Sequence, residues 1–367
     1  MKLKAFCDKY IPIPCIVALA LGAFSGIVLL AASLYQPFAE WTVTTVGAFF
    51  RLALAKLTTF LPFSLAELLL YTSPILLVLL ILFAARIGSA CGRIRLLCAI
   101  LAVISLFYVV YVFTLGVGYH RTPLASRMEL ASVTVDRESL IATADILKRE
   151  SEALASEIEF DESGSSVTEL DIREVSSLIV DGYAALAEDM PSLGIEAFSS
   201  SAKPVLASKL LTKLELLGIY SFFTGESNVN VHYPDYTMPF TVAHEFAHQR
   251  GISRENEANF IAFLVCIRSS DPYVRYSGYV NMLEYVASAL NRTDKEAGSS
   301  LYAALSAEVY GEMRAYSKFY YDNKSELLGT ISEFVNDNYL KAQGTEGVVS
   351  YGLVVRLAVA YYSNGEG

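Results

Sequence analysis

The segment TVAHEFAHQRGISRENEANF (residues 241–260) contains His244 and His248 four positions apart, with Glu245 directly after the first histidine. Residues i and i+4 of a helix project from the same face, so both imidazoles can bind one metal ion. A glutamate beside that ion can take a proton from an attacking water. Imidazole and carboxylate ligands favour zinc over other divalent metals. The alternative to a metal site is a surface helix with an incidental histidine pair.

A third ligand is expected from the residues that follow. Gly251 is predicted to end the first helix, and Ser253 to cap a second helix after a very short connection. Glu255 and Glu257 point about 200° apart on that helix, so only one of them can face the metal. Glu255 is favoured, because its spacing to Asn259 suits a carboxylate ligand with an amide one turn on; Glu257 stays the alternative.

Membrane segments are indicated by the composition, which is 54% hydrophobic and too apolar for an ordinary soluble domain. Three uncharged runs, 11–35, 68–85 and 96–119, each have about the 18–20 residues that a membrane-spanning helix needs. The stretch 41–62 is apolar but contains Arg51 and Lys56, and it is predicted to be an interfacial amphipathic segment. The first run could instead be a signal peptide, although its length favours an uncleaved anchor.

The orientation follows from the charges that flank these runs. Basic residues precede the first run and fill the turn between the second and third, and both groups are expected in the cytoplasm: Lys2, Lys4, Lys9, Arg86, Arg93 and Arg95. Three crossings then place the chain after about Tyr119 outside. We therefore expect a multi-pass protein of the cell membrane, with a membrane domain at 1–119 and an extracytoplasmic domain at 120–367.

The second domain is predicted to be mainly α-helical. Asp136 is expected to cap a helix over 136–159, and residues 161–166 have the composition of a loop. Helical spacing also occurs in 168–188, 203–217, 272–290, 301–321, 327–342 and 348–362. One strand is expected, at 227–233, as an edge strand that could pair with an extended peptide or serve no function.

Nucleic acid is excluded as a partner, because the chain has a net charge of −10 and no basic stripe. Cys266 is the one cysteine after the membrane region, so no disulfide can form within the second domain. Tyr233 and Tyr236, shortly before the histidine motif, could stabilise a developing oxyanion, although packing is the simpler role for a tyrosine.

The motif resembles that of the zincin superfamily, and more narrowly of the gluzincins, in which a glutamate of an E-x-x-x-D motif supplies the third ligand. Asn259 stands here where that pattern has Asp. The whole chain resembles a bacterial membrane-protein family known as domain of unknown function 3810, which combines three N-terminal spans with an HExxH domain. That resemblance rests on FTGESNVNVHYPDYTMPFTVAHEFAHQRGISRENEANFIAFL (223–264) and YLKAQGTEGVVSYG (339–352). It implies a zincin-like domain and a metal site.

Two functions are compatible with these features. The first is a membrane-anchored zinc metallopeptidase that acts on a peptide or protein substrate, with the zinc ion on His244, His248 and Glu255 and with Glu245 as general base. The second is a non-catalytic zinc-binding receptor or scaffold, whose site would normally have four protein ligands. The sequence offers three obvious ligands, which favours catalysis. A transporter is disfavoured, because the spans contain no ionisable residues of the kind that mark a transport pathway.

Overall fold

The computed structural model describes residues 11–343 and 351–363. The chain forms two compact units. Unit 1 contains the residues up to Arg121 together with the short segment Ser221–Glu226, and unit 2 contains Thr122–Tyr220 and the chain from Ser227 onward. Nothing in the sequence indicated that residues 221–226 belong to unit 1.

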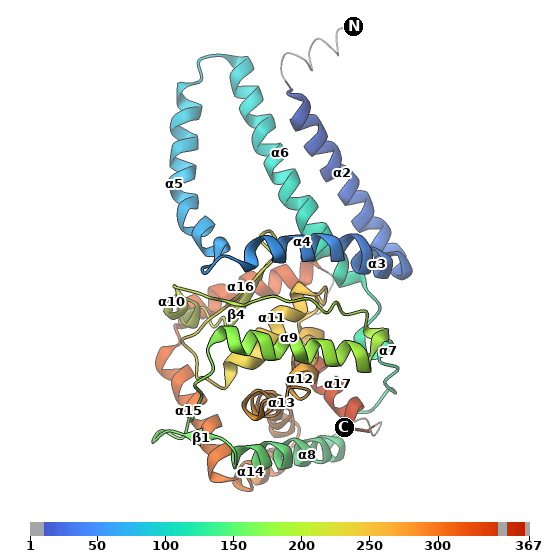
Figure 1. Ribbon diagram of the computed structural model, residues 1–367, viewed down its shortest axis with the longest axis vertical. Coiled ribbons are helices and arrows are strands. Elements are labelled where there is room, and N and C mark those ends of the chain that lie inside the picture. The colour runs from blue at the N-terminus through green and yellow to red at the C-terminus, as the bar shows by residue number, and fades with distance from the viewer. Residues whose placement is uncertain (1–10, 344–350, 364–367) are drawn as a thin grey trace. The chain divides into compact units, whose positions relative to one another are not determined.

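Three helices in the described residues are long and apolar enough to cross a membrane: α2 (Ile13–Leu34), α5 (Leu65–Arg86) and α6 (Ala90–Thr114) (Figure 1). They confirm the three predicted runs. The Ser64 hydroxyl accepts the backbone N–H of Glu67 and caps α5, so this helix begins before the apolar run does. A 3-10 turn, η2 (Gly116–His120), follows α6, so the third helix ends earlier than the apolar run.

The segment between the first two spans is helical but irregular. It consists of α3 (Gln36–Thr42), a π-helical turn η1 (Val43–Gly47) and α4 (Ala48–Thr59). Arg51 is 1% exposed, and its Nη2 donates to the Val43 carbonyl at 2.8 Å. A π-helical turn leaves some backbone carbonyls without their regular α-helical hydrogen bonds, and the Arg51 guanidinium donates a hydrogen bond to one of them. Of the two charges that suggested an interfacial helix, only Lys56 is therefore exposed within unit 1.

The segment Ser221–Glu226 is tightly integrated into unit 1. The Glu226 carboxylate is 2% exposed and accepts the first two backbone N–H groups of α5, at 3.0 and 2.9 Å. A buried carboxylate is favourable there, because a helix N-terminus presents unpaired donors and a positive dipole end. The ring of Phe222 packs on Tyr111 and that of Phe223 on Phe107. The segment thus has both polar and aromatic partners.

Most helices of unit 2 match the sequence prediction. The helix expected at 136–159 is α8 (Arg137–Ala155), and Asp136 caps it in a reciprocal capping box with Ser139. The remaining matches are α9 (Ile172–Asp189), α13 (Pro272–Thr293), α16 (Glu326–Ala342) and α17 (Tyr351–Ser363), while residues 348–350 lie outside the described part of the chain. The short elements α7 (Leu124–Arg127) and η3 (Pro191–Leu193) were not predicted.

Two of the predicted helices are wrong in part. Residues 203–217 form a strand β3 (Lys203–Pro204) and a short helix α10 (Ser208–Lys213), because a proline disfavours helix at the residue before it. Residues 301–321 are divided between α14 (Lys295–Ala303) and α15 (Ala307–Asn323), since Ser306 caps a new helix. The predicted loop at 161–166 is largely confirmed, as the turn between the antiparallel strands β1 (Glu159–Phe160) and β2 (Ser166–Val167).

The strand expected at 227–233 is β5 (Glu226–Val229), but the prediction of an edge strand is wrong. The sheet order is β3-β5-β4, so β5 is central, and it pairs in parallel with β3 through Lys203 and Asn228. All four residues of β5 are buried instead of alternating. Its polar side chains bond to backbone groups, as when Asn228 Nδ2 donates to the Ile219 carbonyl. The two edge strands are β3 and β4 (Gly218–Ser221).

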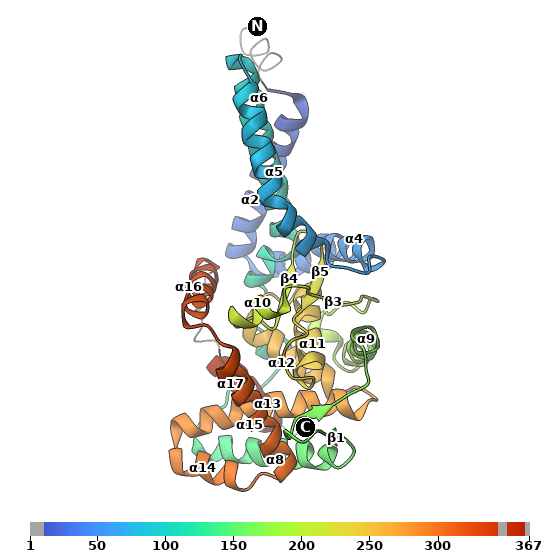
Figure 2. The same cartoon turned by 90° about the vertical axis from the view of Figure 1, so that its left-hand side faces the viewer.

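The core of unit 2 surrounds two consecutive helices, α11 (Thr237–Gln249) and α12 (Glu255–Cys266) (Figure 2). Both pack against each other and against α9 and α13, and α12 also packs against α17. Apolar residues on nearly all sides of α12 are completely buried, which is the pattern of a helix at the centre of a domain. The histidine motif is therefore carried by the most enclosed part of the unit.

Candidate metal centre

The connection between α11 and α12 is a tight helix C-cap. Gly251 has φ +88°, a conformation that glycine adopts without steric cost. The Gly251 N–H donates to the His248 carbonyl and the Ile252 N–H to the Ala247 carbonyl, both at 3.0 Å, as in a Schellman motif. Arg254 occupies the N-cap position of α12 and makes no side-chain capping bond, so the expected cap at Ser253 is wrong. The turn brings the start of α12 back to the end of α11.

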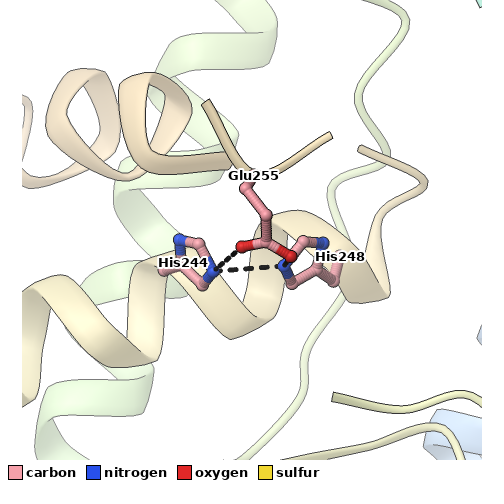
Figure 3. A group of neighbouring side chains, drawn as sticks. All are labelled: His244, His248 and Glu255. Carbon is pink, nitrogen blue, oxygen red and sulfur yellow. Dashed lines mark hydrogen bonds and ion pairs between the residues drawn. The ribbon is translucent and has the colours of Figure 1, made fainter. Parts of the chain in front are cut away.

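This turn places Glu255 beside the two histidines (Figure 3). The Nε2 atoms of His244 and His248 are 3.1 Å apart. Glu255 Oε2 lies 3.3 Å from the first and Oε1 lies 3.6 Å from the second. Tetrahedral zinc with bonds of about 2.0–2.2 Å keeps its ligands roughly 3.3 Å apart. The three side chains thus have the spacing of donors around one ion.

Electrostatics within this cluster favour a bound cation. Burial alone would lower the pKa of His248, but the adjacent Glu255 carboxylate raises it to about 9. Burial likewise disfavours the charged form of Glu255, yet His248 and His244 hold the pKa of this carboxylate far below its usual range. The cluster therefore holds a proton between a carboxylate and imidazole nitrogens, and a metal ion would displace that proton on binding.

A backbone carbonyl orients the imidazole of His248, whereas Nδ1 of His244 is buried and has no partner among the described residues. His248 Nδ1 lies 2.8 Å from the Ile252 carbonyl and donates a hydrogen bond to it. This bond leaves Nε2 as the nitrogen that could bind a metal ion. The side chain of Arg250, one residue past α11, is completely buried between the rings of Tyr183 and Phe198, at 4.3 and 4.4 Å from their centroids. This cation–π packing holds the C-terminal end of the histidine helix in place.

Glu245 is held between α11 and strand β4. Its side chain lies against the backbone of Gly218, where an added Cβ would be 2.5 Å from Oε1. The Tyr220 N–H bonds to this carboxylate, whereas Oε2 is buried and has no partner among the described residues. Burial raises the pKa of Glu245, and the nearby imidazoles lower it by less. A carboxylate with a raised pKa is a better proton acceptor at neutral pH.

Glu257 lies apart from the histidines. Its Oε1 accepts the Leu124 N–H at 3.0 Å and Arg254 Nη1 at 2.9 Å, and its Oε2 lies 3.4 Å from Arg127 Nη2. The side chain is buried, so these partners compensate its charge. Of the two glutamates that the sequence left open, the structure brings Glu255 to the histidine pair and gives Glu257 to an ion-pair network.

A cleft of about 570 Å³ opens beside the cluster of His244, His248 and Glu255. Residues from β4, α11, α12, α13 and α16 line it, and they include His244, Glu245, Glu255 and Asn259. Tyr233 and Tyr236 are buried and do not line it; their rings pack on Tyr316. The lining also includes Gly218, Glu284, Tyr285 and Tyr316, which the sequence did not single out. Nothing local distinguishes these residues, because folding alone brings them to the cleft.

The family of the chain follows from comparison with known proteins. The model of a family described as "Protein of unknown function (DUF3810)" matches residues 44–359. The chain belongs to this family. The match covers parts of both units, including the whole α11–α12 segment. No curated protein and no solved structure matches the chain. Membership of DUF3810 therefore assigns the chain to a family without giving it an activity.

The assignment of the third ligand can be tested with Glu255→Gln and Glu257→Gln in the full-length protein. Glu255→Gln should weaken zinc binding by more than the roughly 10- to 100-fold that loss of an outer-shell partner costs. Glu257→Gln should keep zinc but lower the melting temperature, since breaking a buried ion pair costs about 3–5 kcal/mol. Metal analysis and thermal unfolding after equilibration with zinc measure both effects. The opposite pattern of zinc retention would rule out Glu255.

Proposed function

We propose that this DUF3810 protein is a membrane-anchored zinc metallopeptidase. The observation that carries the proposal is the convergence of His244, His248 and Glu255 at the edge of an open cleft, with Glu245 beside them. The substrate would be a peptide or protein whose scissile bond reaches this end of the cleft. Two imidazoles and one carboxylate form a donor set that suits zinc.

Zinc fits these residues as a catalytic ion. Three protein ligands leave a position of a tetrahedral ion open, which is the usual arrangement in zinc hydrolases. When bound, zinc would polarise the scissile carbonyl and make a water more acidic. Glu245 would take the proton of the attacking water and pass it to the leaving amine. Its unpartnered Oε2 and its raised pKa support this role.

The edge strand β4 is the element that we propose for substrate alignment. An extended peptide can add to an exposed sheet edge through main-chain hydrogen bonds. The sequence pointed to residues 228–231 for this purpose, but β5 is central in the sheet, whereas β4 is at the edge. Leu217 and Gly218, at the start of β4, line the cleft. A substrate paired with β4 would run past the metal centre.

A structural zinc site in a receptor or scaffold is the alternative. Such a site usually has four protein ligands and no access for substrate. Among the described residues, the cluster contains three donors and no fourth histidine or cysteine. The cysteine nearest in sequence, Cys266, is completely buried at the far end of α12. The open cleft and the three-donor cluster favour catalysis over a purely structural ion.

We also propose that unit 2 lies outside the cytoplasm. The basic residues before α2 and between α5 and α6 support this orientation, because positively charged flanks stay inside. A phosphatase reporter that is active only outside the cytoplasm should be active when fused after Gly164. A fluorescent protein that matures only in the cytoplasm should be dark at the same position. Fluorescence without phosphatase activity would invert the orientation.

Replacing the proposed base tests the chemistry. Glu245→Gln should abolish hydrolysis of an unbiased peptide library, with a loss of at least about a hundredfold, because the amide cannot accept the proton. Zinc content should stay near one ion per chain, since Glu245 is not a proposed ligand. Mass spectrometry of the cleavage products and metal analysis give the two readouts. Undiminished cleavage by this variant would refute the mechanism. If the parent protein cleaved no peptide and unfolded when a chelator removed its metal, the structural alternative would be favoured.

Gly218→Ala tests whether the position of Glu245 matters, because it displaces this side chain without replacing it. The new methyl group would overlap the Glu245 carboxylate, whose Oε1 is 2.5 Å from the position of that Cβ. We expect kcat/KM to fall on the order of a hundredfold with zinc content unchanged, as for a displacement of about 1 Å. Gly352→Ala is the matched control, because no atom lies within 4 Å of its added Cβ. Equal activity of the two variants would show that β4 does not hold Glu245.

A further inference from the structure

One wall of the cleft is a single face of α13. Asn281, Glu284, Tyr285, Ser288 and Arg292 follow at helical spacing, and all of them line the cleft. None of these residues belongs to the metal cluster. Their polar groups point to a second recognition region in the same cleft, and Glu284 is the acidic residue on this wall.

Glu284 has an incomplete set of protein partners. Its Oε1 accepts the hydroxyl of Tyr236 at 3.0 Å, and Tyr236 is itself completely buried. Its Oε2 has no partner among the described residues, and within that part of the chain no lysine, arginine or histidine forms an ion pair with Glu284. Arg292, the cation of the same wall, donates to Ser288 Oγ at 2.7 Å instead. The carboxylate is thus fixed on one side and open on the other.

Two other carboxylates of unit 2 can be compared with Glu284. Glu312 is completely buried; its Oε2 accepts the Ser166 N–H, at 3.0 Å, and the Tyr276 hydroxyl, while its Oε1 has no partner among the described residues, and this residue does not line the cleft. Glu215 lines the cleft, but its carboxylate bonds to Tyr320 and lies against Gly329. Glu284 lines the cleft on a different wall from Glu245 and the histidine cluster, and the buried Tyr236 hydroxyl fixes one of its oxygens, so a ligand group can act on the other oxygen.

We propose that Glu284 is a specificity-determining residue that binds the ammonium or guanidinium group of a basic residue in the substrate. This inference rests on the proposed peptidase function, for which it names the substrate class. A carboxylate in a partly desolvated cleft is costly without a counter-charge, and a substrate cation would supply one. The Tyr236 hydroxyl would keep Oε1 in place, which leaves Oε2 to accept the cationic donor.

The charge state of the empty cleft is consistent with this role. Burial raises the pKa of Glu284, the Tyr236 hydroxyl lowers it and the Glu312 charge raises it further, so the pKa is about 7. Near neutral pH the carboxyl group is therefore ionised in only part of the molecules. A bound cation favours the ionised form, so substrate binding and ionisation of Glu284 would support each other.

Glu284→Gln in the full-length, zinc-loaded protein tests the proposal. Glutamine keeps an oxygen for Tyr236 but removes the charge. With an unbiased peptide library, the parent should favour lysine or arginine at one fixed position relative to the cleaved bond. In Glu284→Gln this preference should disappear, and kcat/KM for basic peptides should fall about 10- to 100-fold, as for loss of a charged hydrogen bond. Neutral peptides should be cut as before, and Glu284→Asp should recover part of the preference.

Glu296→Gln is the matched control, because Glu296 is exposed on α14 and does not line the cleft. A binding assay separates the two proposals. The library is passed over immobilised, zinc-loaded Glu245→Gln protein, and basic peptides should be retained by this variant and not by Glu245→Gln/Glu284→Gln. Retention without cleavage by the parent would sink the peptidase but keep the Glu284 site. Cleavage or retention without a basic preference, or a preference that survives Glu284→Gln, would overturn the assignment of Glu284.

Discussion

The tight turn between α11 and α12 is the constraint on which the site depends. Gly251 reverses the chain in a left-handed conformation, and the carbonyls at the end of α11 are satisfied within the turn itself. The next helix consequently begins close to His248, and the carboxylate of its first residue, Glu255, lies 3.3 Å from His244 Nε2 and 3.6 Å from His248 Nε2. The Ile252 carbonyl that orients His248 belongs to the same turn. One backbone reversal thus positions one of the three proposed ligands and the carbonyl that orients another.

Rigid packing around this turn makes the geometry specific. α11 and α12 are almost entirely buried, and Arg250 fills the space beyond the histidines with a guanidinium stacked among aromatic rings. This buried guanidinium is stabilised by π faces and by the Phe198 carbonyl at 2.7 Å. On the open side, the cleft adjoins residues whose polar groups are not fully satisfied, Glu245 and Glu284. The helices are thus tightly packed on the buried side, while polar groups beside the cleft have incomplete hydrogen bonding. This arrangement is expected of a binding site.

Agreement between sequence and fold is best where the physical signal is local. The apolar runs, the Asp136 cap and most amphipathic helices depend on residues within a few turns, and they match the structure. The errors occur where long-range contacts decide. Residues 227–229 have a strand pattern, but which strand is at the edge depends on β3 and β4, which pair from elsewhere in the chain. The burial of Arg51 likewise follows from a π-helical turn that the composition of that stretch does not reveal.

The sequence by itself determined the chemistry that is available: two histidines at helical spacing, an adjacent glutamate and a glycine that ends the helix. It also left two candidates for a third ligand, Glu255 and Glu257. Only one of them can face the histidines, because residues i and i+2 of a helix point in different directions. Only the tertiary structure placed Glu255 with the histidines, gave Glu257 to Arg127 and Arg254, and set Gly218 against Glu245. It alone brought Glu284 into the cleft, because that residue comes from a separate helix, and no spacing along the chain encodes a contact made by packing.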